Sequence, residues 1–296
     1  MKRDFLRLSD FTEGEHASLF GRATQLKATR KGGGVVRTLD GRTLLLLFEK
    51  HSTRTRLSFE AAIGQLGGTA ITLPLSESQV SRGESLADTA AVASRYVDAI
   101  VFRTHGDDRL QEAAKYSTVP VINGLSDGGH PVQILADLFT VIERFRSLRG
   151  RIIAWVGDGA SNMALSWIEA APIFGFTLRI SAPEGFRPQG SGTFELVNDP
   201  SAAVRGAHVI TTDVWVSMGQ EKEAAERKRA FAGYCLDEAL LDRALPDAIV
   251  LHCLPAHRGE EITTGVLDGP HSAVLDEAEN RLHVQKALLE ALLLRR

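Results

Sequence analysis

The chain has 296 residues, of which 44% are hydrophobic and 24% charged, and its formal net charge is -3. This length predicts two domains of roughly 150 residues each. The scattered, nearly balanced charges exclude an electrostatic footprint for nucleic acid or an anionic membrane, so any anion must be bound locally.

Short apolar runs alternate with longer stretches of helical period, which is the βαβ rhythm of parallel sheets. The runs are apolar throughout, as expected for strands that helices cover on both faces. They fall into two sets of four, which predicts an α/β fold with two doubly wound parallel-sheet domains joined by a linking helix. The predicted strands lie at residues 42–49, 69–73, 97–102 and 119–123, and at residues 151–157, 176–181, 207–212 and 248–253.

The predicted linking helix runs from Pro131 to Arg146, between the two sets of strands. We therefore expect a first domain at residues 1–146 and a second at 147–274. The first thirty residues predict one or two helices, and residues 275–296 predict a long amphipathic helix that packs back on the first domain.

Targeting signals and cysteine patterns are sparse. No apolar stretch could span a bilayer, and the basic N-terminus has no apolar signal region behind it. Cys235 and Cys253 are the only cysteines, which suggests neither a disulfide framework nor a thiolate metal cage. A cytoplasmic protein with reduced thiols is expected.

The first chemically unusual segment, Ser52-Thr53-Arg54-Thr55-Arg56, follows the first predicted strand and opens a helix that Gly67 is placed to end. Ser52 is the predicted N-cap. A helix N-terminus with interleaved hydroxyls and guanidiniums suits a small dianion such as phosphate. The alternative is a simple cap with solvated arginines, but two arginines in a first turn oppose the helix dipole unless an anion binds.

Further polar side chains follow other strands of the first set. His130 and Gln133 stand where a loop runs into the linking helix, and Arg103 directly follows the third strand. In parallel sheets, ligands bind beyond the carboxyl ends of the strands. His130 could polarise a carbonyl group there, or it could be only a cap.

In the second domain, Asp213 directly follows the predicted strand at 207–212, and Cys253 ends the predicted strand at 248–253. Asp213 could hold an ammonium group, and the alternative is a helix cap for the charged helix that follows within residues 219–231.

Two other patterns suggest different functions. Gly157-Asp158-Gly159 lies between a strand and a helix like a dinucleotide fingerprint, but Asn162 replaces its third glycine and no acidic residue closes the next strand. His252-Cys253 with His257 could suggest a cysteine nucleophile or zinc, but the sequence does not bring together the base or the ligands that either needs.

Taken together, these segments resemble the aspartate/ornithine carbamoyltransferase family along nearly the whole chain. The matching segments are STRTRLSFE (52–60), SQVSRGES (78–85), DTAAVASRYVDAIVFRT (88–104), VPVINGLSDGGHPVQILAD (119–137), GDGASNM (157–163), DVWVSMGQE (213–221), LHCLPAHRGEEI (251–262) and AENRLH (278–283). The second-domain loops look like those of the ornithine branch. The resemblance implies transfer of a carbamoyl group from carbamoyl phosphate to the side-chain amine of ornithine.

The resemblance also implies the roles of individual residues. Arg54, Arg103, His130 and Cys253 would be catalytic. Carbamoyl phosphate would be held by Ser52, Thr53, Arg54, Thr55, Gln79, Arg103, His130, Gln133, Cys253, Leu254 and Arg281. Ornithine would be held by Asn162, Asp213, Ser217 and Met218. No metal or organic cofactor is implied, and the family's basic unit is a homotrimer with sites shared between subunits.

Two departures from the family pattern are present. Ser161 stands where many relatives have asparagine, which bears on the acceptor, and Val132 stands where relatives often have Cys or Thr and should face packing. A carbamoyltransferase for putrescine or a modified ornithine, and a non-catalytic paralogue, are the alternatives.

Overall fold

The computed structural model describes residues 2–190, 192–217 and 219–294. Its contacts divide the chain into two compact units. Unit 1 comprises residues 1–136 and 279–296, and unit 2 comprises residues 137–278. The divisions fall inside two helices, α5 (Pro131–Phe145) and α11 (Val274–Leu293).

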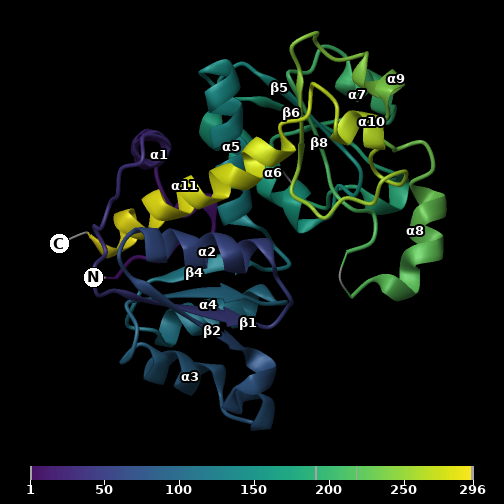
Figure 1. Ribbon diagram of the computed structural model, residues 1–296. Helices are drawn as coiled ribbons and strands as arrows, with labels where there is room; N and C mark the ends of the chain where they lie inside the picture. Colours follow the sequence, from purple (N-terminus) through teal and green to yellow (C-terminus); the bar gives the residue numbers. More distant parts are fainter. Residues whose placement is uncertain (1, 191, 218, 295–296) are drawn as a thin grey trace. The chain divides into compact units, whose positions relative to one another are not determined.

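Unit 1 contains a four-stranded parallel sheet in the order β2-β1-β3-β4 (Figure 1). Its strands are β1 (Thr43–Phe48), β2 (Thr69–Pro74), β3 (Ala99–Arg103) and β4 (Val121–Leu125). The four apolar runs of the first set are therefore confirmed as strands, and the chain reverses its direction across the sheet between β1 and β3.

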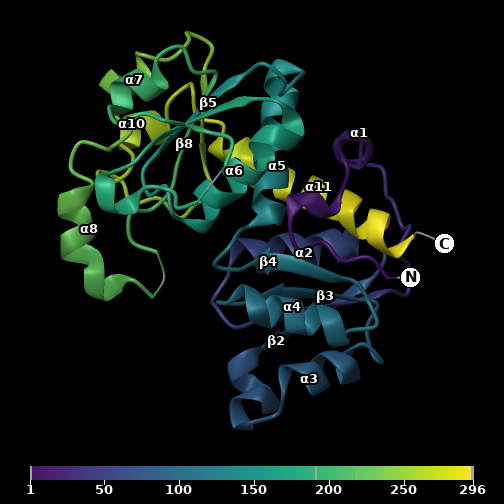
Figure 2. The same cartoon turned by 180° about the vertical axis from the view of Figure 1, so that it is seen from behind.

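Helices cover both faces of this sheet. Figures 1 and 2 show α2 (Arg54–Gln65) on one face, and α3 (Leu86–Ala93) with α4 (Asp107–Tyr116) on the other. Side chains of β1 and β3, including Leu45, Leu47 and Phe102, pack with α3 and α4 in one apolar cluster. Burial of this apolar surface is the main stabilising term for the unit.

The edge strand β2 differs from the expectation that every strand is covered. Its residues are exposed or half-buried, and Ile71 is 50% exposed. The apolar run predicted the strand correctly but not its burial, because an edge strand has a neighbour on only one side. The 3-10 segments η2 (Leu75–Glu77) and η3 (Gln79–Arg82) follow it.

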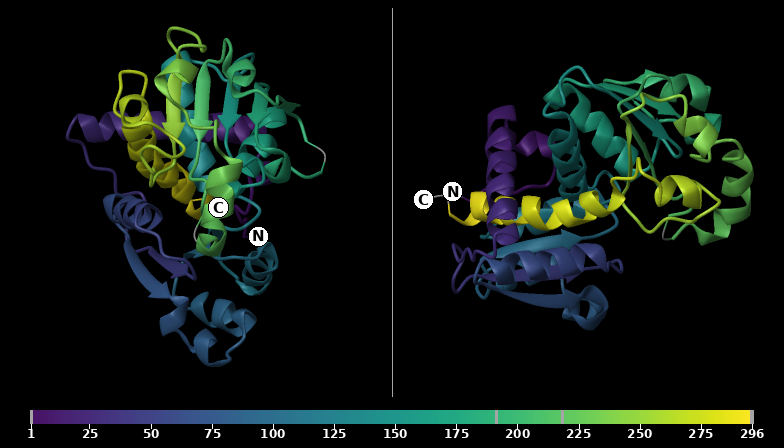
Figure 3. Two further views of the ribbon diagram at one scale, coloured as in Figure 1. Left: turned by 90° about the vertical axis from the view of Figure 1, so that its right-hand side faces the viewer. Right: turned by 45° about the horizontal axis from the view of Figure 1, so that its top comes forward.

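The two ends of the chain meet in unit 1. Helix α1 (Glu13–Lys31) begins with a capping box formed by Thr12 and Glu15. It crosses α11 (Figure 3), and Lys27 donates a hydrogen bond to Asn280 at 2.7 Å. Residues before α1 form the 3-10 segment η1 (Leu8–Asp10).

Unit 2 contains a parallel sheet in the order β7-β6-β5-β8-β9. Its strands are β5 (Ile152–Val156), β6 (Thr177–Ser181), β7 (Glu195–Leu196), β8 (Val209–Thr212) and β9 (Ile249–His252). The prediction of four strands was wrong by one. β7 has only two residues, both exposed, and so leaves no apolar run in the sequence.

Short helices complete unit 2. They are α6 (Asn162–Phe174), η4 (Glu184–Phe186), α7 (Pro200–Val204), η5 (Glu221–Glu223), α8 (Ala224–Ala230), α9 (Glu238–Leu241) and α10 (Thr264–Leu267). One face of the sheet, including Val156, Ile210 and Val250, packs in an apolar cluster with residues of α7, α9 and α10. None of the described helices is long and apolar enough to cross a membrane.

Both sheets are doubly wound, and each has a point where the strand order reverses. In unit 1 this point lies between β1 and β3, and in unit 2 it lies between β5 and β8. Ligands of open parallel sheets bind at such points, outside the carboxyl ends of the strands. The fold therefore has two candidate ligand-binding positions, one in each unit.

Candidate active site

At the reversal point of unit 1, the start of α2 follows β1. The helix begins at Arg54, and its N-cap is Thr53, whose side chain makes no capping hydrogen bond. The prediction that Ser52 caps this helix was wrong, because the helical geometry starts one residue later and Thr53 itself has helical dihedral angles. The first-turn N–H groups of α2 are therefore not capped by the Thr53 side chain, which leaves them suited to an anion.

Arg281 of α11 connects two other predicted residues. Its guanidinium donates to Thr55 Oγ1 at 2.6 Å and to Gln133 Oε1. All three side chains are buried. These bonds join the first turns of α2 and α5, because Thr55 and Gln133 lie on those turns.

His130 lies among the arginines of the same unit. Burial lowers the pKa of its imidazole well below the ordinary value, and repulsion from Arg281, Arg103 and Arg54 lowers it further. His130 is therefore neutral at physiological pH, and a neutral imidazole can still donate one N–H. We call His130, Arg54, Arg103, Arg281, Thr55 and Gln133 the cationic cluster.

Other residues of this region lie outside the cluster. Arg56 pairs with Glu60 at 2.9 Å along α2, which accounts for the second arginine of the motif. Ser52 is half-buried and Thr53 is exposed. Gln79 is exposed on η3, and among the described residues its side chain makes no hydrogen bond with the cluster.

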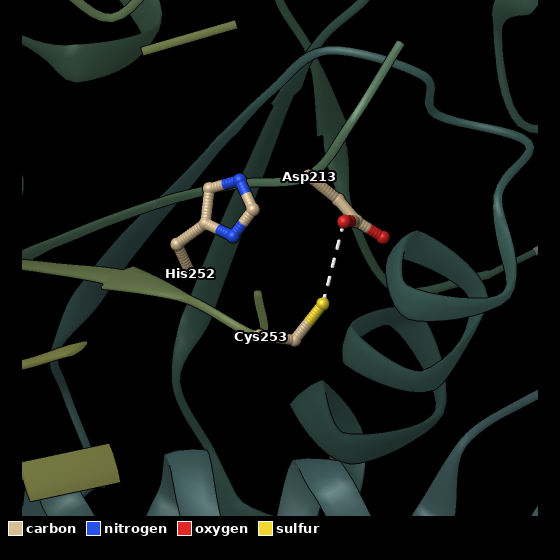
Figure 4. A group of neighbouring side chains, drawn as sticks. All are labelled: Asp213, His252 and Cys253. Carbon is tan, nitrogen blue, oxygen red and sulfur yellow. Dashed lines mark hydrogen bonds between the residues drawn. The ribbon is translucent and has the colours of Figure 1, made fainter. Parts of the chain in front are cut away.

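At the reversal point of unit 2, Asp213 follows β8 and Cys253 follows β9. The Cys253 thiol donates a hydrogen bond to Asp213 Oδ1 at 3.3 Å (Figure 4). Burial raises the pKa of the Asp213 carboxyl, while the nearby His252 and the Val214 N–H lower it. No lysine or arginine of the described chain forms an ion pair with this carboxylate.

Burial also raises the pKa of the Cys253 thiol well above its usual value, and the charges of Asp213, Glu277 and Asp137 raise it further. The side chain is therefore a thiol at neutral pH. A cysteine nucleophile needs a lowered thiol pKa, so the geometry disfavours that alternative. Here Cys253 is a hydrogen-bond donor.

The loop that carries Cys253 is held by His252. Its Nδ1 accepts the Leu254 N–H at 2.9 Å, so Nε2 bears the proton and faces Glu261 Oε1 at 3.1 Å. Leu254 has a left-handed backbone, with a φ of 57°, and packs against the apolar cluster of unit 2. These bonds fix the direction in which Cys253 points.

The remaining predicted acceptor residues lie near the same strand ends. Asn162 is the first residue of α6, and Ser161 caps this helix by accepting the Ala164 N–H at 3.2 Å. The Ser217 N–H donates to Gln220 Oε1 at 3.0 Å in the loop after β8. Met218 lies outside the described residues.

Arg227 of α8 is a buried residue that the sequence did not single out. It forms an ion pair with Asp158, its Nε donates to the Trp215 carbonyl, and it lies 4.7 Å from the Phe186 ring centroid. Arg227 thus connects the turn after β5 with the loop after β8. Nothing distinguishes it in the sequence from the other charges of its helix, and only the fold shows its burial.

The turn after β5 does not form a dinucleotide site. The Gly159 N–H donates to the Phe186 carbonyl at 2.9 Å, and a Cβ on Gly159 would meet Pro188 Cδ at 2.7 Å. The chain itself therefore covers the backbone that a pyrophosphate would need to approach.

Two groups of side chains could supply metal ligands among the described residues. One is Asp213, His252 and Cys253, and the other is His257, Glu260 and Glu261. In the first group, both ring nitrogens of His252 already face hydrogen-bond partners. In the second, Glu260 forms an ion pair with Lys228 at 2.5 Å.

Comparisons with known proteins agree along the whole chain. Residues 3–143 match the family model "Aspartate/ornithine carbamoyltransferase, carbamoyl-P binding domain", and residues 149–292 match "Aspartate/ornithine carbamoyltransferase, Asp/Orn binding domain". The chain is 52% identical to an ornithine carbamoyltransferase of Geobacter sulfurreducens, over 99% of this chain and 100% of that protein. It is 53% identical to one of Cupriavidus taiwanensis, over 98% and 97%.

Solved structures give the same result. The ornithine carbamoyltransferase from Pyrococcus furiosus superposes with a TM-score of 0.94 at 46% identity, covering 99% of this chain and 97% of that one. The enzyme of the same name from Burkholderia thailandensis gives 0.91 at 47% identity, covering 99% of both chains.

Proposed function

The chain belongs to the aspartate/ornithine carbamoyltransferase family, and we propose that it transfers the carbamoyl group of carbamoyl phosphate to the side-chain amine of L-ornithine, giving L-citrulline and phosphate. The observation that carries the choice of ornithine is the Asp213 carboxylate, which has no cationic partner among the described residues and receives only neutral donors. An ammonium-bearing acceptor would satisfy it, whereas an acidic acceptor would be repelled.

Carbamoyl phosphate is proposed to bind at the cationic cluster. Arg54, Arg103 and Arg281 would face the phosphate, and the start of α2 would add backbone N–H groups. Ser52, Thr53, Thr55 and Gln133 would complete the set, with Gln79 as a further ligand. The positive charge supports this assignment, because Arg103 and Arg281 are buried, Arg54 is half-buried, and all three lie near His130, where a bound anion would be stabilised.

Ornithine is proposed to bind at the strand ends of unit 2. Asp213 would hold the α-ammonium group, with Asn162, Ser217 and Met218 along the amino-acid end. Cys253 and Leu254 would lie at the reacting centre. The neutral state of the Cys253 thiol supports an orienting role, since a thiol can donate a hydrogen bond but is a poor nucleophile.

The proposed reaction is an attack of a neutral amine on the carbonyl carbon. The amine electron pair forms the new C–N bond, the C–O bond to phosphate breaks with its electron pair, and the amine proton passes to the departing phosphate. Arg54, Thr55 and neutral His130 would stabilise the charge that develops on the carbonyl oxygen. Ornithine's amine has a reference pKa of about 10, so the site must favour its free base.

Acceptor choice is the main alternative within the family. Putrescine lacks the carboxylate of ornithine but keeps an ammonium group that Asp213 could hold, whereas an ornithine modified on its α-amine would lack a free α-ammonium group for Asp213. The Ser161 departure does not favour either, since serine and asparagine are equally good N-caps and Ser161 acts as one. Val132, the other departure, is fully buried in packing as expected.

The proposal is tested by mixing the purified protein with carbamoyl phosphate and equal concentrations of ornithine, putrescine, acetylornithine and aspartate. We expect citrulline as the main product by mass spectrometry. A main product from another acceptor would reassign the substrate, and no product from any would favour a non-catalytic paralogue.

The assembly is proposed to be a cytoplasmic homotrimer for arginine biosynthesis, in which Gln79 of one subunit completes the site of its neighbour. Two observations support an interface in this part of unit 1: the Gln79 side chain makes no hydrogen bond with the described residues, and the apolar side chains of Leu57 on α2 and Ile71 on β2 are 60% and 50% exposed.

In a cyclic trimer each such segment serves one neighbouring site. Mixing inactive Gln79→Ala and Asp213→Ala proteins with subunit exchange should therefore restore activity. An inactive mixture in which mass spectrometry shows exchange would contradict sharing.

A further inference from the structure

A cation-lined cavity that is open to solvent lies in unit 1, at the opposite end of α2 from Arg54. Its volume is about 330 Å³, and it lies between the end of α1, the loop that follows it, the end of α2 and α11. Its lining includes Leu26, Arg30, Val36, Arg37, Gln65 and Lys286. The volume lies within the range of small-molecule sites.

Lys286 is the buried charge of this cavity. The residue is only 3% exposed, and its ammonium donates to the neutral Gln65 Oε1 at 3.2 Å. Burial lowers the pKa of this amine and repulsion from Arg30 lowers it further, while the negative charge of Glu290 raises it. A buried ammonium without an acidic partner is costly, so an arriving anion would be stabilised there.

One acidic side chain of α11 attracts the Lys286 ammonium, but it is shared with other donors. Glu290, one turn after Lys286, accepts two hydrogen bonds from Arg22 at 2.6 and 2.9 Å and a third from Thr38. The Glu290 carboxylate thus binds α1 and the loop after it, and it forms no ion pair with Lys286 in the described chain.

The rim of the cavity adds positive charge and an apolar wall. Arg30 is exposed and has no ion-pair partner among the described residues. Arg37 pairs with Asp40 at 2.7 Å, but both side chains are more than half exposed, so water weakens that pair. None of the described residues that line the cavity is acidic, and Leu26, Val35 and Val36 supply apolar surface.

We propose that this cavity is a binding site for a small organic polyanion with a short apolar body, separate from the cationic cluster. The anionic groups meet Lys286 and the rim arginines, and the apolar body packs on Leu26 and Val36. The site does not depend on the carbamoyl-transfer proposal, because none of its residues belongs to the cationic cluster.

Calorimetric titration with citrate and with pyrophosphate tests this site. Citrate represents polycarboxylates, and pyrophosphate represents phosphate esters. The Arg54→Ala variant weakens anion binding at the cationic cluster, so any remaining binding that is lost when Lys286 is also changed reports the cavity. We expect Arg54→Ala to bind at least one probe with one-to-one stoichiometry, and the Arg54→Ala/Lys286→Met double variant to bind it at least tenfold more weakly.

A matched control is Lys115→Met in the Arg54→Ala background, which removes an exposed lysine of α4 and should leave affinity unchanged. Arg30→Ala, on the exposed rim, provides a second variant if Lys286→Met does not fold, and should also weaken binding. Equal affinity with and without Lys286, or no binding of either probe to Arg54→Ala, would overturn the proposal.

Discussion

The two reversal points use the same topology but carry opposite charge. At β1 and β3, three arginines lower the pKa of buried His130, whereas at β8 and β9 carboxylates raise the pKa of half-buried Cys253. Burial is the largest cause of the pKa shift of both His130 and Cys253, and the neighbouring charges shift each pKa in the same direction as burial. The two sheets thus place side chains at equivalent points, while the residues after each strand make one point positive and the other negative.

The largest expected effect comes from removing a charge at the cationic site. Arg54→Ala should lower kcat/KM by about 10²–10³-fold, because this guanidinium is proposed to contact both phosphate and the developing oxyanion. Steady-state citrulline formation measures the effect. The matched control is Arg56→Ala, whose side chain pairs with Glu60, and which should lose far less. Similar losses in both variants would show that the cluster is not the anion site.

Removing the charge at the acidic site should have the next largest effect. Asp213→Asn should lower kcat/KM for ornithine by about 100-fold, since a buried ammonium would lose its counter-charge. The loss should appear in the KM for ornithine, and the KM for carbamoyl phosphate should change little. An equal rise in both KM values would contradict separate sites for the two substrates.

Arg227, the buried cation of unit 2, is expected to affect stability. Arg227→Met should lower the free energy of unfolding by about 3 kcal/mol, because it leaves the Asp158 carboxyl buried without its partner. Denaturant unfolding measures this value. Arg258→Met, which breaks an exposed pair with Asp268, is the control and should leave stability unchanged. If the two variants are equally stable, the Arg227 pair does not hold the loops of unit 2.

The smallest effect concerns His130 and pH. Its folded pKa is lowered, so the unfolded chain takes up this proton first as the pH falls. The contribution of neutral His130 to stability is complete above the unfolded pKa of about 6.5 and is lost as the pH falls toward the folded pKa. His130→Gln should therefore show a smaller decrease in melting temperature between pH 7 and pH 5 than the wild type. An identical decrease would mean that His130 is not held neutral.

The sequence predicted most of the fold because buried parallel strands leave continuous apolar runs. It missed β7, which is short and exposed, and it placed the α2 cap at Ser52, one residue early, since serine and threonine stand side by side and both are good caps. Segments that follow strands gave Arg54, Arg103, Asp213 and Cys253 as candidates.

Partners that lie far apart in the sequence could not be predicted from it. The bonds from Arg281 to Thr55 and Gln133 span 226 and 148 residues. The pair formed by Arg227 and Asp158 joins a charged helix to a glycine turn. Neither of these sequence patterns predicts that the two segments lie together. Lys286 likewise lies on an amphipathic helix, and only the packing of α1 and α11 shows that it is buried.

The most direct test of opposite charge at the two sites is calorimetric binding of carbamoyl phosphate, without ornithine, to three proteins. We expect the wild type and Asp213→Asn to bind it with the same affinity, and Arg54→Ala to bind it at least 100-fold more weakly. Undiminished binding by Arg54→Ala, or lost binding by Asp213→Asn, would contradict the assignment of the anion to unit 1.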